Sequence, residues 1–269
     1  MTETRNWIRA ANVTKQVVPM DRIESMLKEQ RALDSFLAQS DSDLFASYIA
    51  KATELFHSLL QDSTWSPSNT PTTAFESMQP TLANHQSARL RYACHLMGVE
   101  PETLEDSIEL SNERFMRSGL FPRFYAYQAI TEVTAREHAL QLIRDFIDTW
   151  YAQEAEQQPE DSTLSPYWDQ LEAPSEVTNG IAAKPQEGKL VFRVDGCILH
   201  EVMQPLDDPI LADLACCYGD RANFEALNPN FVFTRVHTLM TGPYCDTCMH
   251  DRRLVDSIDH PTQEYFEKL

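Results

Sequence analysis

The sequence predicts an α+β protein in which a helical N-terminal layer packs on a small antiparallel sheet. Two observations indicate this class. Residues 1–151 carry apolar side chains at the three- and four-residue spacings of amphipathic helices, whereas residues 189–269 hold runs of β-branched and aromatic residues that are typical of strands. Residues 152–188 are acidic and interrupted by prolines, and we interpret them as a linker, part of which could be ordered through Tyr167 and Trp168. The sequence leaves open whether the cysteine-rich α+β unit at 189–269 forms one compact domain with the helices.

The helices of the first region are predicted from apolar periodicity and from the residues that interrupt it. Gly98 and Gly119 are typical of helix ends, and Pro101 and Pro122 are typical of helix starts. A stretch rich in Ser, Thr and Pro is interpreted as a loop. The expected helices cover about 20–39, 41–61, 84–97, 101–119 and 123–155, and the loop covers 62–80.

The last region changes to strand-like patterning. Strands are expected at 190–195 and 231–237, where β-branched and aromatic residues are concentrated, and at 245–251, after a Gly-Pro turn. Helices are expected between the first two strands, at 200–203 and 211–227, and the second should end at Asn228-Pro229. The order β-α-α-β-β predicts a short antiparallel sheet with helices on one face.

Charge and apolar content exclude several classes of function. The chain of 269 residues has 41 acidic and 22 basic residues and a net charge of −19, which disfavours binding to nucleic acid or to anionic membrane surfaces. No stretch is long and apolar enough for a membrane span, and no secretory signal is visible. We therefore expect a cytoplasmic protein with reduced cysteines rather than a disulfide framework. Its expected partner is a small-molecule substrate, and homo-oligomerisation is left open.

Nucleophilic and metal-ligating residue types are concentrated near the C-terminus. Five of the six cysteines fall within about fifty residues, together with several His and Asp residues. Such a concentration favours a chemical site over a packed core. The cysteines are Cys197, Cys216, Cys217, Cys245 and Cys248, and the other residues are His200, Asp220, His237, Asp246, His250 and Asp251.

Five short motifs also follow one another in this region. They are a cysteine after the first strand, a C-x-x-D segment, an N-P turn, an R-x-x-T-L strand and a G-x-x-C-D close, carried by Cys197, Cys217 to Asp220, Asn228-Pro229, Arg235 to Leu239 and Gly242 to Asp246. In this order they resemble the L-2-amino-thiazoline-4-carboxylic acid hydrolase family, over about residues 190–250. The sequence departs from the family at Thr247, where members commonly have an aromatic residue, and in the additional thiols of Cys216 and Cys248.

The resemblance implies hydrolysis of a cyclic amidine-type substrate, in which opening of a thiazoline ring gives N-carbamoyl-cysteine. It also implies a fold similar to vinyl-reductase-type ligand-binding domains. The main functional hypothesis is therefore a small-molecule hydrolase acting on a carbon–nitrogen or carbon–sulfur bond. One alternative is a cyclase or isomerase of secondary metabolism, acting in the biosynthesis of a specialised metabolite. A second alternative is a non-catalytic ligand- or metal-binding module.

The residues themselves suggest how such a ring could be opened. The reaction needs a nucleophile or activated water, a proton donor for the leaving group and a binder for a carboxylate. Cys217 and Asp220 are three residues apart and should share a face of the predicted helix. Because a neighbouring carboxylate disfavours a thiolate, activation of the thiol must come from elsewhere. Arg235 and His237, on one face of the second strand, could provide it.

These considerations define the candidate site. The alternative interpretation is that Cys217 packs as a small apolar side chain and that Asp220 is an exposed helix residue. The candidate catalytic residues are Cys217, Asp220, Cys197, His237 and Cys245, and the candidate substrate-binding residues are Arg235, Thr238, Asp246 and Asn228.

A zinc site is the competing interpretation of the same cysteines. Cys245, Cys248 and His250 have metal-ligand types at a plausible spacing. A structural zinc usually takes two separated ligand pairs, and adjacent Cys216 and Cys217 make a poor second pair. We therefore expect no metal and no other cofactor, with zinc as the alternative left open.

Overall fold

The structure, a computed structural model, describes residues 2–61, 80–100 and 103–269, and it divides into two compact units. The helical unit comprises residues 14–146, and the sheet unit comprises residues 1–13 together with 147–269. Helices and an antiparallel sheet occur together, so the predicted α+β class is confirmed. No helix in the described part of the chain is long and apolar enough to cross a membrane.

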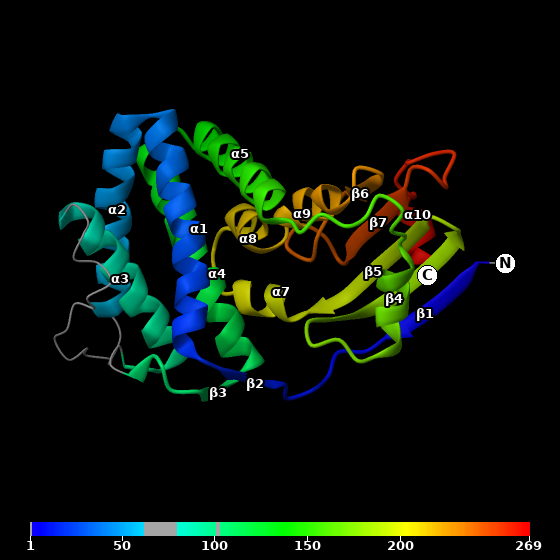
Figure 1. Cartoon of the computed structure of the whole chain (residues 1–269), viewed down its shortest axis with the longest axis horizontal. Helices are drawn as coiled ribbons and strands as arrows, with labels where there is room; N and C mark the ends of the chain where they lie inside the picture. The colour runs from blue at the N-terminus through cyan, green and yellow to red at the C-terminus, as the bar shows by residue number, and fades with distance from the viewer. Residues whose placement is uncertain (1, 62–79, 101–102) are drawn as a thin grey trace. The chain divides into compact units, whose positions relative to one another are not determined.

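The helical unit is built from long helices and a short β-ribbon (Figure 1). Apolar residues at helical spacing are buried, for example Tyr48, Ala52 and Phe56, and this confirms the helices expected at 20–39, 41–61 and 84–97. The loop expected at 62–80 lies outside the described residues except for its last position. The elements are β2 (Thr14–Val17), α1 (Pro19–Ser40), α2 (Ser42–Gln61), α3 (Pro80–Met97), β3 (Ile108–Ser111), α4 (Asn112–Val133) and most of α5 (Arg136–Glu154).

The helices expected at 101–119 and 123–155 are wrong in their boundaries. α4 starts at residue 112, where the Ser111 hydroxyl accepts a hydrogen bond from the backbone N–H of Arg114 at 3.3 Å, and it continues through Gly119 and Pro122. A Cβ at Gly119 would meet the guanidinium group of Arg22, which packs against this part of α4. Glycine at this position therefore permits close packing and does not end the helix.

A group of polar side chains is buried inside the helical unit. Asp34 on α1 lies among Tyr48 of α2 and Gln86 and Arg89 of α3, and all four are at most 5% exposed. Burial raises the pKa of Asp34 to about 7, although the positive charge of Arg89 acts in the opposite direction. The helical unit therefore holds a carboxyl group that is protonated well above its usual pH range.

The sheet unit contains an antiparallel sheet in the order β1-β4-β5-β7-β6 (Figure 1). The strands expected at 190–195 and 245–251 are confirmed, and the strand expected at 231–237 ends two residues early. Gly188, in the turn between β4 and β5, has a φ of +75°, which favours glycine. The strands are β1 (Glu3–Trp7), β4 (Thr178–Gln186), β5 (Lys189–Cys197), β6 (Phe231–Arg235) and β7 (Cys245–Asp251).

Two strands of this sheet come from segments that were not expected to form strands. β1 lies inside the expected helical region 1–151, and β4 lies inside the expected linker 152–188, together with the short helices α6 (Ser165–Asp169) and η3 (Gln170–Glu172). β4 is stabilised by its neighbours on both sides, since it pairs with β1 and β5 and fully buries Ala182 and Ala183. The linker interpretation is therefore wrong for residues 165–186.

The remaining helices of the sheet unit are short. They are α7 (Ile198–Met203), α8 (Pro209–Cys216), α9 (Gly219–Leu227) and α10 (Gln263–Glu267). The single helix expected at 211–227 is thus interrupted at Cys217 and Tyr218. α9 ends before Asn228, as expected, and it packs against β6.

Side chains alternate between two faces of the sheet. One face carries Phe192, Phe233 and Met249, and we call it the cavity face. The opposite face carries Val191 and Cys248, which pack with Phe266 of α10, and we call it the α10 face. The alternation decides which of the candidate residues can meet.

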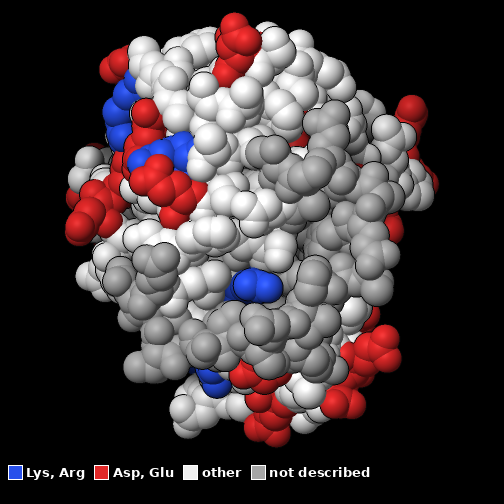
Figure 2. Space-filling model, turned by 90° about the vertical axis from the view of Figure 1, so that its left-hand side faces the viewer, with Lys and Arg blue, Asp and Glu red and all other residues white. Residues whose placement is uncertain are grey.

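The charge of the surface agrees with the composition. Figure 2 shows one face of the molecule, on which acidic side chains cover more of the surface than basic ones. This distribution fits the net charge of −19.

Candidate active site

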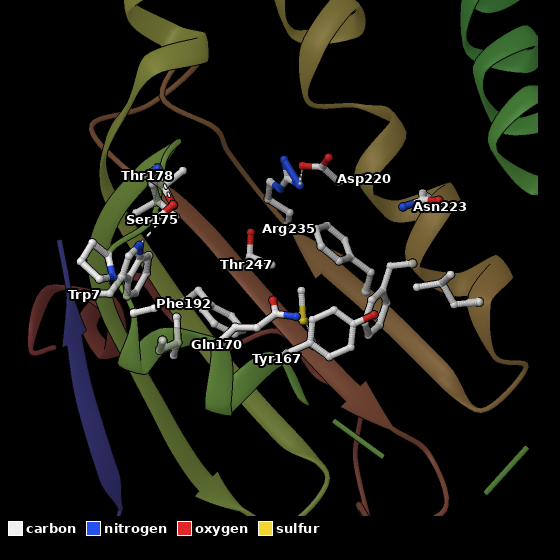
Figure 3. A pocket seen from close by; sticks show the side chains of 18 residues that line it. Trp7, Tyr167, Gln170, Ser175, Thr178, Phe192, Asp220, Asn223, Arg235 and Thr247 are labelled. Carbon is white, nitrogen blue, oxygen red and sulfur yellow. Dashed lines mark hydrogen bonds and ion pairs between the residues drawn. The ribbon is translucent and has the colours of Figure 1, made fainter. Parts of the chain in front are cut away.

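An ion pair between Arg235 and Asp220 lies at the centre of the candidate site (Figure 3). Arg235 is the last residue of β6 and lies opposite Thr247 on the cavity face, whereas Asp220 lies in the first turn of α9. The Arg235 Nη2 donates to Asp220 Oδ2 at 2.7 Å, and Nη1 donates to the carbonyl oxygen of Cys217 at 3.4 Å. Packing of α9 against β6 therefore holds the two charges together.

The pair lies where two cavities adjoin. A larger cavity of about 500 Å³ is lined by both Arg235 and Asp220, and a smaller one of about 300 Å³ is lined by Arg235, Cys217 and His237. Arg235 and Phe233 line both cavities. A small molecule bound in either cavity can therefore reach the guanidinium group.

The carboxyl group of Asp220 titrates close to neutral pH. Surrounding protein raises its pKa to about 6, Arg235 opposes that rise and Asp213 adds to it. The Asp220 side chain is 56% accessible and lines the larger cavity. Asp220 can therefore gain and lose a proton near physiological pH.

The thiols near this pair keep their protons. The pKa of Cys217 is raised well above its usual value, first by the contact with the Cys216 thiol and then by burial. The sulfur atoms of Cys216 and Cys217 lie 3.0 Å apart. Burial raises the pKa of Cys197 to about 11 and that of Cys245 to about 12. Electrostatic coupling of Cys197 and Cys245 to Cys217 shows that the three thiols are close. They are neutral donors at physiological pH, and thiolate nucleophiles are disfavoured.

The C-x-x-D segment positions its two residues differently from the sequence expectation. Cys217 caps the C-terminus of α8, and Asp220 belongs to the first turn of α9, so the two are not on one continuous helix. They are still electrostatically coupled, and the negative charge of Asp220 contributes to the raised pKa of Cys217. Proximity was correctly predicted, but from the wrong local structure.

The C-x-x-C segment is divided between the two faces of the sheet. Cys245 lies opposite Val194 on the cavity face, and Cys248 lies opposite Val191 on the α10 face, where it is fully buried. Residues three apart in a strand point to opposite sides. The zinc alternative built on Cys245 and Cys248 therefore does not fit, and no group of three or more His, Cys, Asp or Glu residues in the described chain could hold a metal.

His237 and Asp246 belong to a second polar cluster. His237 lies beyond the end of β6, so the expectation that it shares a strand face with Arg235 is wrong. Its Nε2 lies 3.2 Å from Asp246 Oδ2, and the Nε2 of His260 lies 3.4 Å from the same oxygen. Burial would raise the pKa of Asp246, but hydrogen bonds from His260 and from the backbone N–H groups of His237 and Val236 outweigh it and lower the pKa. His237 thus lines the smaller cavity while Asp246 holds its ring.

The two remaining candidates have different positions. Thr238 lines the smaller cavity and donates a hydrogen bond to Asp213 Oδ1 at 2.8 Å. Asn228 is fully buried, and its amide donates to the carbonyl oxygen of Pro159 at 2.9 Å and accepts from the N–H of Asn230. Asn228 therefore fixes the chain after α9, and it is not among the described residues that line either cavity.

Sequence reasoning missed most of the wall of the larger cavity. Trp7 of β1 donates its indole N–H to Thr178 Oγ1 at 3.1 Å, and Tyr167 and Gln170 come from α6 and η3. These residues belong to segments without periodicity or motif. The apolar aromatic content of 1–13 and 165–171 was the available signal.

The motif order agrees with a match to a known family. The family model named L-2-amino-thiazoline-4-carboxylic acid hydrolase matches residues 113–249, just over half of the chain. The match includes Cys197, Cys217, Asp220, Arg235 and Cys245, and it begins well before residue 190, where the motifs were first recognised. Curated proteins and solved structures give no match to this chain.

Proposed function

Because the chain belongs to the L-2-amino-thiazoline-4-carboxylic acid hydrolase family, we propose that it hydrolyses a cyclic amidine-type substrate at Arg235 and Asp220. The observation that carries the proposal is the position of this ion pair, where two cavities adjoin. The pKa of Asp220, about 6, supports it as well. A carboxyl group of this kind can accept and return a proton within one catalytic cycle.

In the proposed reaction, the Asp220 carboxylate takes a proton from a water molecule whose oxygen adds to the amidine carbon. The ring bond from that carbon to sulfur or nitrogen then breaks as the added oxygen becomes a carbonyl oxygen, and the second proton of the water passes to the amidine nitrogen that the addition left negatively charged. The leaving atom takes the proton back from Asp220, so that one water is consumed and the carboxylate is restored. For a 2-amino-thiazoline ring, the products of this sequence are a free thiol and a carbamoyl group.

Arg235 has two tasks in this proposal. It stabilises the ionised form of Asp220 through the 2.7 Å contact, and it binds an anionic group of the substrate. The second task is supported by its Nε, which is buried and has no acceptor among the described residues. An unpaired buried donor of this kind gains free energy when a ligand carboxylate approaches.

The thiols act as neutral groups in this proposal. Thiol attack on the substrate would require a thiolate, and the pKa values of Cys217, Cys197 and Cys245 are all raised. We assign Cys217 the role of a hydrogen-bond donor beside Asp220. Replacement of Cys217 by serine distinguishes a hydrogen-bond donor from a nucleophile. A hydroxyl group can replace a thiol as a donor, but it is a much weaker nucleophile.

The test measures ring opening of 2-amino-thiazoline-4-carboxylate by mass spectrometry. Asp220→Asn should lower kcat by about 10²–10⁴-fold, the usual effect of removing one acid–base group. Cys217→Ser should retain the rate within about tenfold if the thiol only donates a hydrogen bond. A loss in Cys217→Ser as large as that in Asp220→Asn would instead identify the thiol as the nucleophile.

A matched control is provided by a second carboxylate–guanidinium pair of the sheet unit. Asp195 accepts from the guanidinium of Arg193 at 2.9 Å, and neither residue is among the described residues that line the two cavities. Asp195→Asn should keep the wild-type rate, because pairs of this kind at the surface contribute little. Equal losses in Asp195→Asn and Asp220→Asn would contradict the proposal.

The larger cavity also favours a second candidate, a non-catalytic ligand-binding module. A cavity of about 500 Å³ with aromatic walls can retain a ligand without any chemical step. The two functions differ in one measurement. Stoichiometric binding of cyclic amidines without product, in wild type as in Asp220→Asn, would favour the binding module. An isomerase on the same site would instead give a product of unchanged mass, and a cyclase that closes a ring by condensation would give a product lighter by one water.

A further inference from the structure

The charged side chains of the larger cavity are gathered at one place. Its walls come from the cavity face of the sheet, from α6 and η3 and from α9, and most of the lining side chains are apolar. In Figure 3, Arg235 and Asp220 lie together, and the aromatic rings of Tyr167 and Phe192 lie apart from them. The cavity therefore combines one charged end with a mostly apolar body, which uncharged polar side chains such as Gln170 and Asn223 interrupt.

The apolar part is extended along α9. Asp220 lies in the first turn of this helix, and Leu227, its last residue, also lines the cavity. Seven residues of helix correspond to about 10 Å. A ligand held at Asp220 therefore has about that length of wall beside it, in which Phe224 and Leu227 are apolar and Asn223 is polar.

The volume exceeds what a small polar ring requires. Cavities of roughly 300–1,000 Å³ take ligands of drug size, and this one measures about 500 Å³. A five-membered ring with an amino group and a carboxyl group would occupy only the charged end. The rest would stay filled with water against Phe192, Phe233 and Met249, which is unfavourable for apolar walls.

We propose that the substrate carries an apolar substituent, alkyl or aryl, that fills the larger cavity while its polar ring reacts at Arg235 and Asp220. The inference rests on the proposed ring opening and defines the substrate class of that site. The carboxylate of the substrate meets Arg235, the amidine carbon lies beside Asp220, and the substituent extends along α9 toward Leu227.

The test uses 2-amino-thiazoline-4-carboxylates that carry methyl, ethyl, propyl or butyl groups at ring carbon 5 or at the exocyclic nitrogen. Affinity is measured by calorimetry and ring opening by mass spectrometry. Each methylene that enters the cavity should raise the affinity about fourfold. In at least one of the two series, we therefore expect a rise of more than tenfold from the methyl to the butyl compound.

A variant that fills the Leu227 end of the larger cavity tests whether the substituent binds there. Leu227→Trp, which places a larger side chain at the end of the cavity, should remove the gain in affinity with chain length. Ala226→Trp is the matched control, because Ala226 precedes Leu227 on α9 and is not among the described residues that line the cavity. This control should keep the gain. The chain-length series in wild type remains decisive even if Leu227→Trp fails to fold.

The outcomes separate this inference from the proposed function. Length-dependent binding without ring opening would support the apolar subsite and overturn the hydrolase proposal. Ring opening with no length dependence in either series would leave the hydrolase proposal standing and overturn the apolar subsite. An equal gain in wild type and Leu227→Trp would also overturn it, because the substituent would then bind elsewhere.

Discussion

Replacement of Asp34 by Asn should change the way in which stability depends on pH. Asp34 is 5% exposed inside the helical unit, and burial raises its pKa to about 7 from an ordinary value of 3.8. The folded state therefore binds a proton at this carboxyl group more tightly than the unfolded state does. Asn has nearly the same shape and cannot titrate, so the variant isolates this contribution.

The direction and the size of the change in the free energy of unfolding follow from the linkage between proton binding and folding. Below about pH 4, Asp34 is protonated in both states. Between pH values of about 4 and 7, only the folded state keeps the proton, so stability falls as the pH rises. A shift of about three pKa units corresponds to about 4 kcal/mol. Above about pH 7 the carboxyl group is ionised in both states, and the effect is constant.

The assay is urea unfolding followed by circular dichroism, at several pH values between about 4 and 8. We expect wild type to lose about 4 kcal/mol relative to Asp34→Asn over this range. Asp43→Asn, at an exposed position, removes the same formal charge and controls for total charge. Parallel stability curves for wild type and Asp34→Asn would refute the reasoning, because the two states would then bind the proton equally.

Two further outcomes are expected from the sheet unit. The proposed reaction needs the carboxylate form of Asp220, so kcat/KM should rise with pH through about 6 and level off above it. A pH–rate profile measures this, and a profile that falls through this range would show that the protonated form of Asp220 is the active one. A strong zinc chelator should leave the thermal unfolding midpoint unchanged, because Cys245 and Cys248 lie on opposite faces of the sheet; a large drop would reveal a metal that supports the fold.

Part of the fold could be predicted because local pattern and final structure agree. In β5, β-branched and aromatic residues lie between a glycine turn and Cys197, and the strand forms where the pattern places it. The long apolar stripe of α2 likewise becomes the buried side of a helix. In such segments, the side chains that the sequence pattern predicts to be buried are the ones that the tertiary structure buries.

Other elements depend on partners distant in sequence. β1 is mostly polar, and β4 contains Gly, Ala and Pro, so neither has the composition of a strand. β1 forms by pairing with β4, and β4 forms by pairing with β1 on one side and β5 on the other. Trp7 belongs to the cavity wall for the same reason, and no local pattern relates it to Asp220. The break at Tyr218 between α8 and α9 also has no proline or glycine before it to mark it.

The candidate site shows the same division. Motif order grouped Cys197, Cys217, Asp220, Arg235 and Cys245, and the structure brings these residues close together. The sequence indicated one cause of the raised thiol pKa values, the carboxylate of Asp220, but not the larger causes, because burial and the contact between Cys216 and Cys217 depend on the fold. Their chemical roles stay predictions until the variants are measured.

The position of β1 has a consequence for the order of events during synthesis. Trp7 and its hydrogen-bond partner Thr178 are 171 positions apart, so the first strand leaves the ribosome long before the strand with which it pairs. At the usual rates of translation, the delay is roughly 10–30 s. During this interval the helical unit can fold, while β1 remains an unpaired edge whose alternating charged residues Glu3 and Arg5 limit association with other chains. The larger cavity is closed on its Trp7 side only after that wait.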